Sequence, residues 1–147
     1  LEAAEYGLPS VLWSYPRGPE ISKKAETSID TISYAAHIAA LLGAHIIKVK
    51  PPTSSISESS LEKNYNALIN LNSLSERVKH IKKCAFNSKR IVVFSGGNAK
   101  GEDEILTEIK QIKDGGGNGS IIGRNSFQRP KKQALNLLNK IIEIYKN

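Results

Sequence analysis

The 147-residue sequence predicts an α/β fold of four consecutive β/α units, which amounts to half of a TIM (β/α)8 barrel. Short apolar runs bounded by glycine and proline alternate along the chain with longer segments of helical periodicity. This alternation is typical of parallel strands with helices packed outside them. Because a complete barrel takes about 250 residues, we expect residues 1–147 to form a single partial barrel domain.

Four apolar runs are predicted to be the strands. They span residues 8–15, 44–50, 91–94 and 119–123. The first run, LPSVLWSY, is expected to be a short buried strand that Pro16 and Gly18 terminate. Pro51 and Pro52 end the second strand in the same way.

Apolar residues spaced three and four apart predict the helices. These span residues 28–42, 61–71, 73–86, 102–112 and 130–145. Thr27 or Ser28 can cap the first helix, and Gly43 stands where a left-handed C-terminal cap belongs. The serine-rich residues 53–60 are expected to form a loop. The glycine run 115–117 is interpreted as a turn, because a dinucleotide-binding loop would follow a strand and open a helix.

The composition excludes several classes of protein. No segment approaches the roughly 18 apolar residues of a membrane helix, and the single Cys84 favours a reducing, cytoplasmic environment. The net charge of +7 is scattered without a basic stripe, so it is interpreted as solvated surface and no nucleic-acid partner is expected. The three histidines lack metal-ligand spacing. The chain has no Met and starts at Leu1, so we expect that residue 1 is not an ordinary translation start: the alternatives are a fragment, a split gene product and a chain whose beginning was not recorded.

Functional residue types gather at the carboxyl ends of the predicted strands, where β/α barrels place their active sites. They are Trp13, Tyr15 and Arg17 on the first, Lys48 and Lys50 on the second, Ser95, Gly96 and Gly97 on the third, and Gly123 and Arg124 on the fourth. Two lysines two residues apart point to the same side of a strand. Repulsion between their ammonium groups favours a neutral amine, which can form a Schiff base with a ketone. The spacing leaves equally open that both lysines only reach solvent.

The turns Ser95-Gly96-Gly97 and Gly123-Arg124 are candidate phosphate sites. Glycine lets backbone N–H groups approach a phosphate, and arginine adds charged hydrogen bonds. The loops after the last two strands of such barrels commonly bind phosphate. The alternative is that the glycines serve turn geometry alone, but their position favours phosphate.

Five segments carry a resemblance to a known family. WSYPRG, GAHIIKVKPP, RIVVFSGG, GEDEIL and GSIIGRNSFQRP occur in this order and resemble the class I, Schiff-base-forming fructose-bisphosphate aldolases of archaea and bacteria. The resemblance leaves out only the part near residues 53–75, and it implies that the chain is the C-terminal half of that barrel, strands five to eight. It also implies site residues: Lys48 as the Schiff-base lysine, Tyr15 as proton donor and acceptor with Trp13 beside it, Ser95, Gly96, Gly97, Gly123 and Arg124 as phosphate ligands, and Arg17 and Lys50 as further anion contacts.

The implied reaction is the reversible cleavage of fructose 1,6-bisphosphate to dihydroxyacetone phosphate and glyceraldehyde 3-phosphate, a step of glycolysis and gluconeogenesis that uses no metal or cofactor. In that family the first four strands contribute an acidic active-site residue. We therefore expect a complementary N-terminal half or pairing of copies in a homo-oligomer, unless the chain is an inactive remnant. Two alternatives remain open: a related Schiff-base or transaldolase-like enzyme, and a non-catalytic remnant that binds anions or nucleic acid.

Overall fold

The computed structural model describes residues 2–97 and 99–146, and its strands form one parallel sheet. The four strands are β1 (Val11–Trp13), β2 (Ile46–Val49), β3 (Ile91–Ser95) and β4 (Gly119–Ile121). They lie side by side in chain order, and every neighbouring pair is parallel. The predicted succession of β/α units is therefore confirmed.

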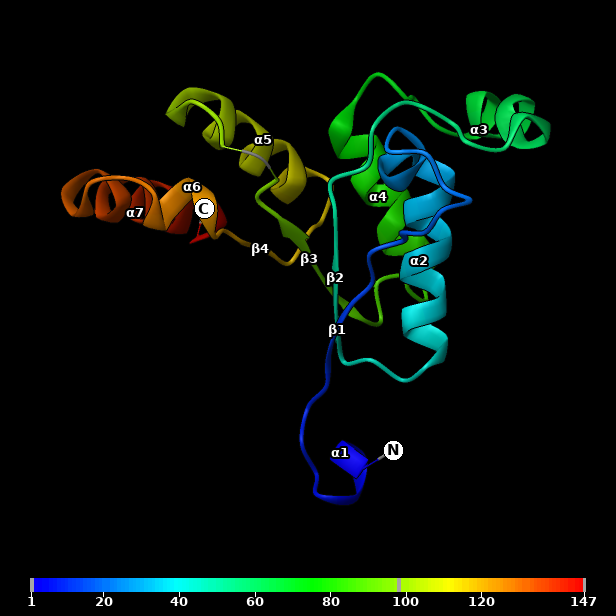
Figure 1. Ribbon diagram of the computed structural model, residues 1–147, viewed down its shortest axis with the longest axis horizontal. Helices are drawn as coiled ribbons and strands as arrows, with labels where there is room; N and C mark the ends of the chain where they lie inside the picture. The colour runs from blue at the N-terminus through cyan, green and yellow to red at the C-terminus, as the bar shows by residue number, and fades with distance from the viewer. Residues whose placement is uncertain (1, 98, 147) are drawn as a thin grey trace.

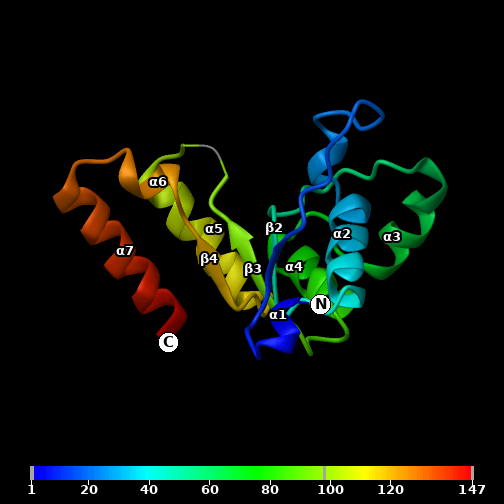
Figure 2. The same cartoon turned by 60° about the horizontal axis from the view of Figure 1, so that its bottom comes forward.

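Helices follow each strand. The longer ones are α2 (Ile29–Leu41), α4 (Leu74–Cys84), α5 (Glu102–Asp114) and α7 (Lys131–Lys146), and the shorter ones are α1 (Glu2–Glu5), α3 (Glu62–Leu68), α6 (Arg124–Phe127) and the 3-10 turns η1 (Ala25–Thr27) and η2 (Ser59–Leu61). In Figure 1, α2 and α4 lie to the right of the strands and α5 and α7 to the left, and in the turned view of Figure 2 α2 and α7 again lie on opposite sides of the strands. None of the helices in the described residues combines the length and apolar character that crossing a lipid bilayer requires.

Local signals explain where these helices begin and end. The Ser73 hydroxyl accepts a hydrogen bond from the Glu76 amide at 3.4 Å and so caps the start of α4. Acidic residues fill the first turn of α5, where the helix dipole favours negative charge. Gly43 adopts a φ of 86° after α2, as the predicted left-handed cap requires. Gly116, with a φ of 83°, turns the chain between α5 and β4, which confirms the predicted turn.

One face of the sheet packs on the helices and holds the main core. Leu12, Ile47 and Val92 share a register position, and Val49 and Phe94 share another two residues further on. Ile47, Val49, Val92 and Phe94 are fully buried and cluster with apolar residues of α2, α4 and α5. Because successive residues of a strand point to opposite faces, Lys48 belongs to the other face.

That other face is open. Its apolar side chains remain exposed: Val11 by 50%, Trp13 by 63%, Ile91 by 46% and Ile121 by 41%. The expectation that the first strand is buried is therefore wrong for the side chains of β1 that point away from the helices. Within the described residues β1 and β4 each have a neighbouring strand on one side only, as in a barrel cut in half.

The structure also shortens several predicted elements. β1 covers three of the eight residues expected, and α3 ends at Leu68. The predicted strand 119–123 stops at Ile121, and the next residues turn into α6, which the sequence did not predict. A helix of four residues is too short to show a 3.6-residue period, so hydrophobic periodicity cannot reveal it.

Candidate active site

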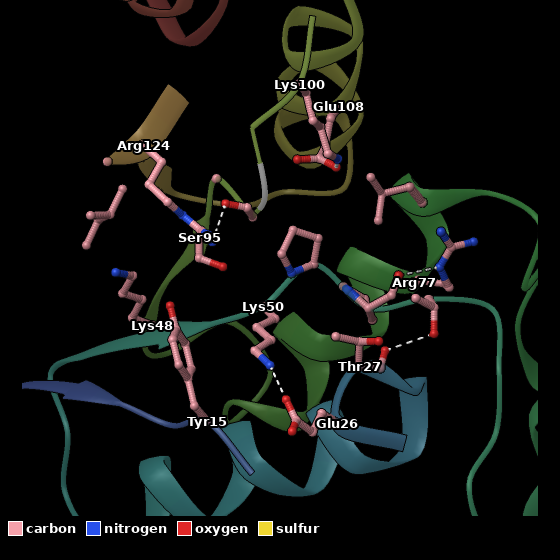
Figure 3. A pocket seen from close by; sticks show the side chains of 18 of the residues that line it. Tyr15, Glu26, Thr27, Lys48, Lys50, Arg77, Ser95, Lys100, Glu108 and Arg124 are labelled. Atoms are coloured by element: carbon pink, nitrogen blue, oxygen red, sulfur yellow. Dashed lines mark hydrogen bonds and ion pairs between the residues drawn. The ribbon is translucent and has the colours of Figure 1, made fainter. Parts of the chain in front are cut away.

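A cavity of about 940 Å³ lies at the carboxyl ends of the four strands (Figure 3). The sequence-predicted residues that line it are Tyr15, Arg17, Lys48, Lys50, Ser95, Gly96, Gly97, Gly123 and Arg124. Trp13 is the one predicted site residue that does not line this cavity, although its ring contacts Lys48. Parallel strands end at one edge of the sheet, which is why Tyr15 and Arg124, 109 positions apart in the chain, share this space.

Lys48 is buried against aromatic rings. Only 6% of the residue is exposed, and its Nζ lies 3.7 Å from the centre of the Trp13 ring and 5.8 Å from that of Tyr15. The β1–β2 register places Trp13 directly beside Lys48, and the two rings stack with centroids 6.3 Å apart. In the described part of the chain Lys48 makes no ion pair with a carboxylate, so aromatic faces are what hold its amine in place.

Lys50 has a different neighbour, which the sequence analysis missed. Its Nζ lies 2.7 Å from Oε2 of Glu26, a carboxylate on η1 that is 5% exposed. Lys23 donates to the other oxygen of Glu26 at 2.8 Å. Hydrogen bonds from Lys23 and then Lys50 lower the pKa of Glu26 from 4.5 to about 2. In Figure 3, Lys50 reaches toward Glu26, whereas Lys48 extends away from that pair.

The two glycine-rich turns lie next to each other. The register pairs Ser95 with Ile121, and the Gly96 amide donates to the Ile121 carbonyl at 3.2 Å. The Arg124 guanidinium donates to the Gly97 carbonyl at 3.1 Å and so spans from one turn to the other. Gly97 has a φ of 65°, a left-handed conformation that glycine adopts without strain. Both turns and the Arg124 side chain line the same cavity, whereas the Gly96 N–H is already bonded to the Ile121 carbonyl.

Further polar residues of the cavity were not predicted either. Lys100 Nζ lies 2.5 Å from Glu108 Oε2, and both residues line the cavity. Arg77 donates from Nε to the Pro52 carbonyl at 2.9 Å and ties α4 to the end of the lysine strand. Their signal in the sequence is weak, since charged residues on or beside a helix usually form its solvated face. Across the described residues, no group of three or more His, Cys, Asp and Glu side chains is placed to hold a metal ion.

The fold and the cavity together define part of a β/α-barrel protein with a buried lysine beside two glycine-rich turns and an arginine. A sequence model of the DeoC/LacD family aldolases matches residues 1–129. The chain belongs to this family of aldolases.

Individual relatives agree with this assignment. The chain is 32% identical over 154 residues to a probable fructose-bisphosphate aldolase class 1 of Chlamydia muridarum, and the match covers 97% of this chain and 44% of that protein. An archaeal fructose 1,6-bisphosphate aldolase superposes with a TM-score of 0.76 at 30% identity, covering 99% of this chain and 48% of that one. Another archaeal aldolase structure, with its catalytic Lys bound covalently to the carbinolamine intermediate of the substrate, also has a TM-score of 0.76, at 28% identity over 99% and 48% of the two chains. The chain thus spans about half the length of these relatives.

Proposed function

We propose that this chain is the C-terminal half, strands five to eight, of a class I fructose-bisphosphate aldolase and that it carries the Schiff-base lysine. The observation that carries the proposal is the position of Lys48. Its amine is buried against Trp13 and lines a cavity that also contains two glycine-rich turns with an arginine. A buried lysine without a carboxylate partner is rare unless it has a chemical role.

The reaction follows from these positions. Lys48 Nζ adds to the C2 ketone of fructose 1,6-bisphosphate, and loss of water leaves an iminium ion. The C4 hydroxyl loses its proton, the C3–C4 bond breaks, and its electron pair moves onto the iminium to form an enamine as glyceraldehyde 3-phosphate leaves. Tyr15, which lines the cavity beside Lys48, transfers protons in this step and protonates the enamine at C3. Water then hydrolyses the iminium and releases dihydroxyacetone phosphate.

The anionic groups of the substrate have matching partners. We place one phosphate beside the Arg124 guanidinium, at the Gly96-Gly97 turn and at Gly123, with the N–H groups of Gly97 and Gly123 as donors, because the Gly96 N–H already donates to the Ile121 carbonyl. Arg17 and Lys50 line the same cavity and supply further positive charge. Lys50 is held by Glu26, which leaves Lys48 as the better candidate for the nucleophile.

We further infer that a complementary N-terminal half barrel completes the site. Val11, Trp13, Ile91 and Ile121 would point into the interior of a closed barrel, where other strands would bury them. A groove of about 600 Å³ along β4 and α7 is also uncovered. The full-length relatives are about twice as long as this chain, which favours such a half over a second copy. A glycolytic step of this kind would favour the cytoplasm as the location that we propose for the protein.

Reductive trapping tests the proposed chemistry. The native protein, isolated without denaturation so that any complementary half stays bound, is incubated with dihydroxyacetone phosphate and borohydride, and the labelled peptide is mapped by mass spectrometry. We expect the label on Lys48, and Lys48→Ala should abolish both labelling and cleavage because no other group supplies the iminium. Lys50→Ala is the matched control and should keep the label while turnover falls.

The same experiment separates the alternatives. A label on Lys50, or turnover of fructose 1,6-bisphosphate without any label, would contradict the assignment of Lys48. Labelling of Lys48 without cleavage of fructose 1,6-bisphosphate would indicate a different aldol-type reaction. The native mass measured in parallel distinguishes a complementary half from a homo-oligomer.

A further inference from the structure

Asn125 is a buried amide side chain between the two glycine-rich turns. It is the second residue of α6, directly after Arg124, and only 3% of it is exposed. Its Nδ2 donates to the Gly96 carbonyl at 2.8 Å, and its Oδ1 accepts from the Lys100 amide, also at 2.8 Å. One side chain after β4 therefore binds the segment after β3 at two separate points.

Both bonds depend on the chemistry of an amide. The carbonyl of Gly96 needs a donor and the amide of Lys100 needs an acceptor, and an amide side chain offers both in one plane. Breaking either bond would leave a partly buried backbone group without this partner. Arg129 reinforces the arrangement, because it donates to the carbonyl of Lys100 at 2.7 Å and to that of Asn125 at 2.8 Å.

The turns themselves offer little to hold them in place. Gly96 and Gly97 have no side chains, and Gly97 adopts a left-handed φ of 65°. A glycine-rich segment has many accessible conformations unless contacts from elsewhere restrict it. The contacts of Asn125 lie at the edge of the segment that should receive a phosphate. Together with the Gly96–Ile121 backbone bond and the bond from Arg124 to the Gly97 carbonyl, they restrict the distance between the two turns.

We propose that Asn125 is a positioning residue, which fixes the spacing of the turns at Gly96-Gly97 and Gly123 so that the N–H groups of Gly97 and Gly123 converge on one phosphate. It acts through the backbone and touches no ligand. The inference rests on the proposed phosphate site and adds the residue that keeps that site assembled before the ligand arrives. Pre-organised donors bind an anion better than donors that must be ordered on binding.

Inorganic phosphate is the probe that tests this role without any Schiff-base chemistry. Phosphate is titrated into the ¹⁵N-labelled full chain, and the amide signals of Gly96, Gly97 and Gly123 are followed by NMR. Asn125→Ala removes both hydrogen bonds, whereas Asn125→Asp keeps the acceptor but sets an oxygen against the Gly96 carbonyl. We expect both variants to weaken phosphate binding by roughly tenfold or more, as small misplacements of binding groups commonly do. Asn139→Ala, at an exposed asparagine on α7, should bind within about twofold of the unaltered chain.

A second measurement separates positioning from a general loss of stability. Trapping with borohydride is compared for dihydroxyacetone phosphate and for dihydroxyacetone, which has no phosphate. Asn125→Ala should lower the preference for the phosphorylated ketone by the same factor as phosphate affinity, whereas a general structural defect would lower trapping of both ketones together. If phosphate shifts the amide signals of both Asn125 variants as it does those of the unaltered chain, the role of Asn125 is overturned but the phosphate site is not. If phosphate leaves the amide signals of the unaltered chain unshifted, both the phosphate site and the role of Asn125 are overturned.

Discussion

Glu26 Oε2 lies 2.7 Å from Lys50 Nζ, and this ion pair makes two lysines on the same strand unequal. Lys50 is matched to a buried carboxylate, whereas two residues earlier Lys48 lies against the face of Trp13. Only the folded chain reveals the difference, because 24 positions separate Glu26 from Lys50 in the sequence. The pairing supports Lys48 as the group that attacks a ketone and Lys50 as a fixed positive charge.

The Glu26 carboxylate should make stability depend on pH in the acid range. Its pKa in the folded chain is about 2, below the ordinary value of 4.5, because Lys23 and Lys50 donate to it. Because the pKa of Glu26 is lower in the folded chain than in the unfolded one, the ionised carboxylate adds to the free energy of unfolding. This contribution is fully present above about pH 4.5 and is lost as the pH falls toward 2. Glu26→Gln should therefore unfold at lower urea than the unaltered chain at pH 6, and the difference should shrink steadily toward pH 2.

The control for this experiment is Glu20→Gln, which changes an exposed carboxylate nearby in the chain. It should alter the free energy of unfolding by no more than about 0.5 kcal/mol. A Glu26→Gln effect of equal size at pH 2 and pH 6 would contradict the ion pair as its cause.

Trp13 should report closure of the barrel. It is the single tryptophan of the chain and is 63% exposed on the open face. A strand that covers this face would exclude water from the ring, so tryptophan emission should move to shorter wavelength when the first four β/α units of a relative, made without tryptophan, are added. Trp13→Phe gives the background. A shift that instead follows the concentration of this chain alone would indicate pairing of copies.

Arg124 should contribute strongly to phosphate binding. Hydrogen bonds to charged groups are worth about 1.5–3 kcal/mol, which corresponds to roughly 10- to 150-fold in affinity. We therefore expect Arg124→Ala to weaken binding of dihydroxyacetone phosphate by about that factor in calorimetric titrations. Lys131→Ala removes the same charge from an exposed position at the start of α7 and should change the affinity far less. Equal losses in the two variants would mean that overall charge, not the site, attracts the ligand.

Gly115 should tolerate no side chain, for reasons of space. A Cβ there would lie 2.4 Å from the Ser75 carbonyl oxygen and 2.6 Å from Cβ of Val78. Overpacking of this kind typically costs about 1–3 kcal/mol, so Gly115→Ala should lower the free energy of unfolding by that amount in urea titrations. Gly119→Ala is the control, since its Cβ would meet only Val93 at an ordinary 3.7 Å. Equal stability of the two variants would show that α4 can move away from the turn.

The sequence by itself determined the architecture and the edge on which the site lies. Apolar periodicity within about a dozen residues encodes each strand and each long helix. Parallel strands end at one edge, so Tyr15, Lys48, Ser95 and Arg124 could be assigned to one site from their places at or just beyond the carboxyl ends of predicted strands. The turn at Gly116 and the cap at Gly43 were likewise readable, because glycine marks left-handed backbone.

Only the tertiary structure decided which groups these residues meet. Glu26 beside Lys50 and Asn125 beside Gly96 and Lys100 are contacts between segments 24 to 29 positions apart. The sequence placed Trp13 at the end of a strand, but only the β1–β2 register shows that its ring lies against Lys48. Local patterns specify the conformation of a segment, but distances between segments depend on how helices and strands pack. For that reason the partners of the two lysines and of the glycine-rich turns could be known only from the folded chain.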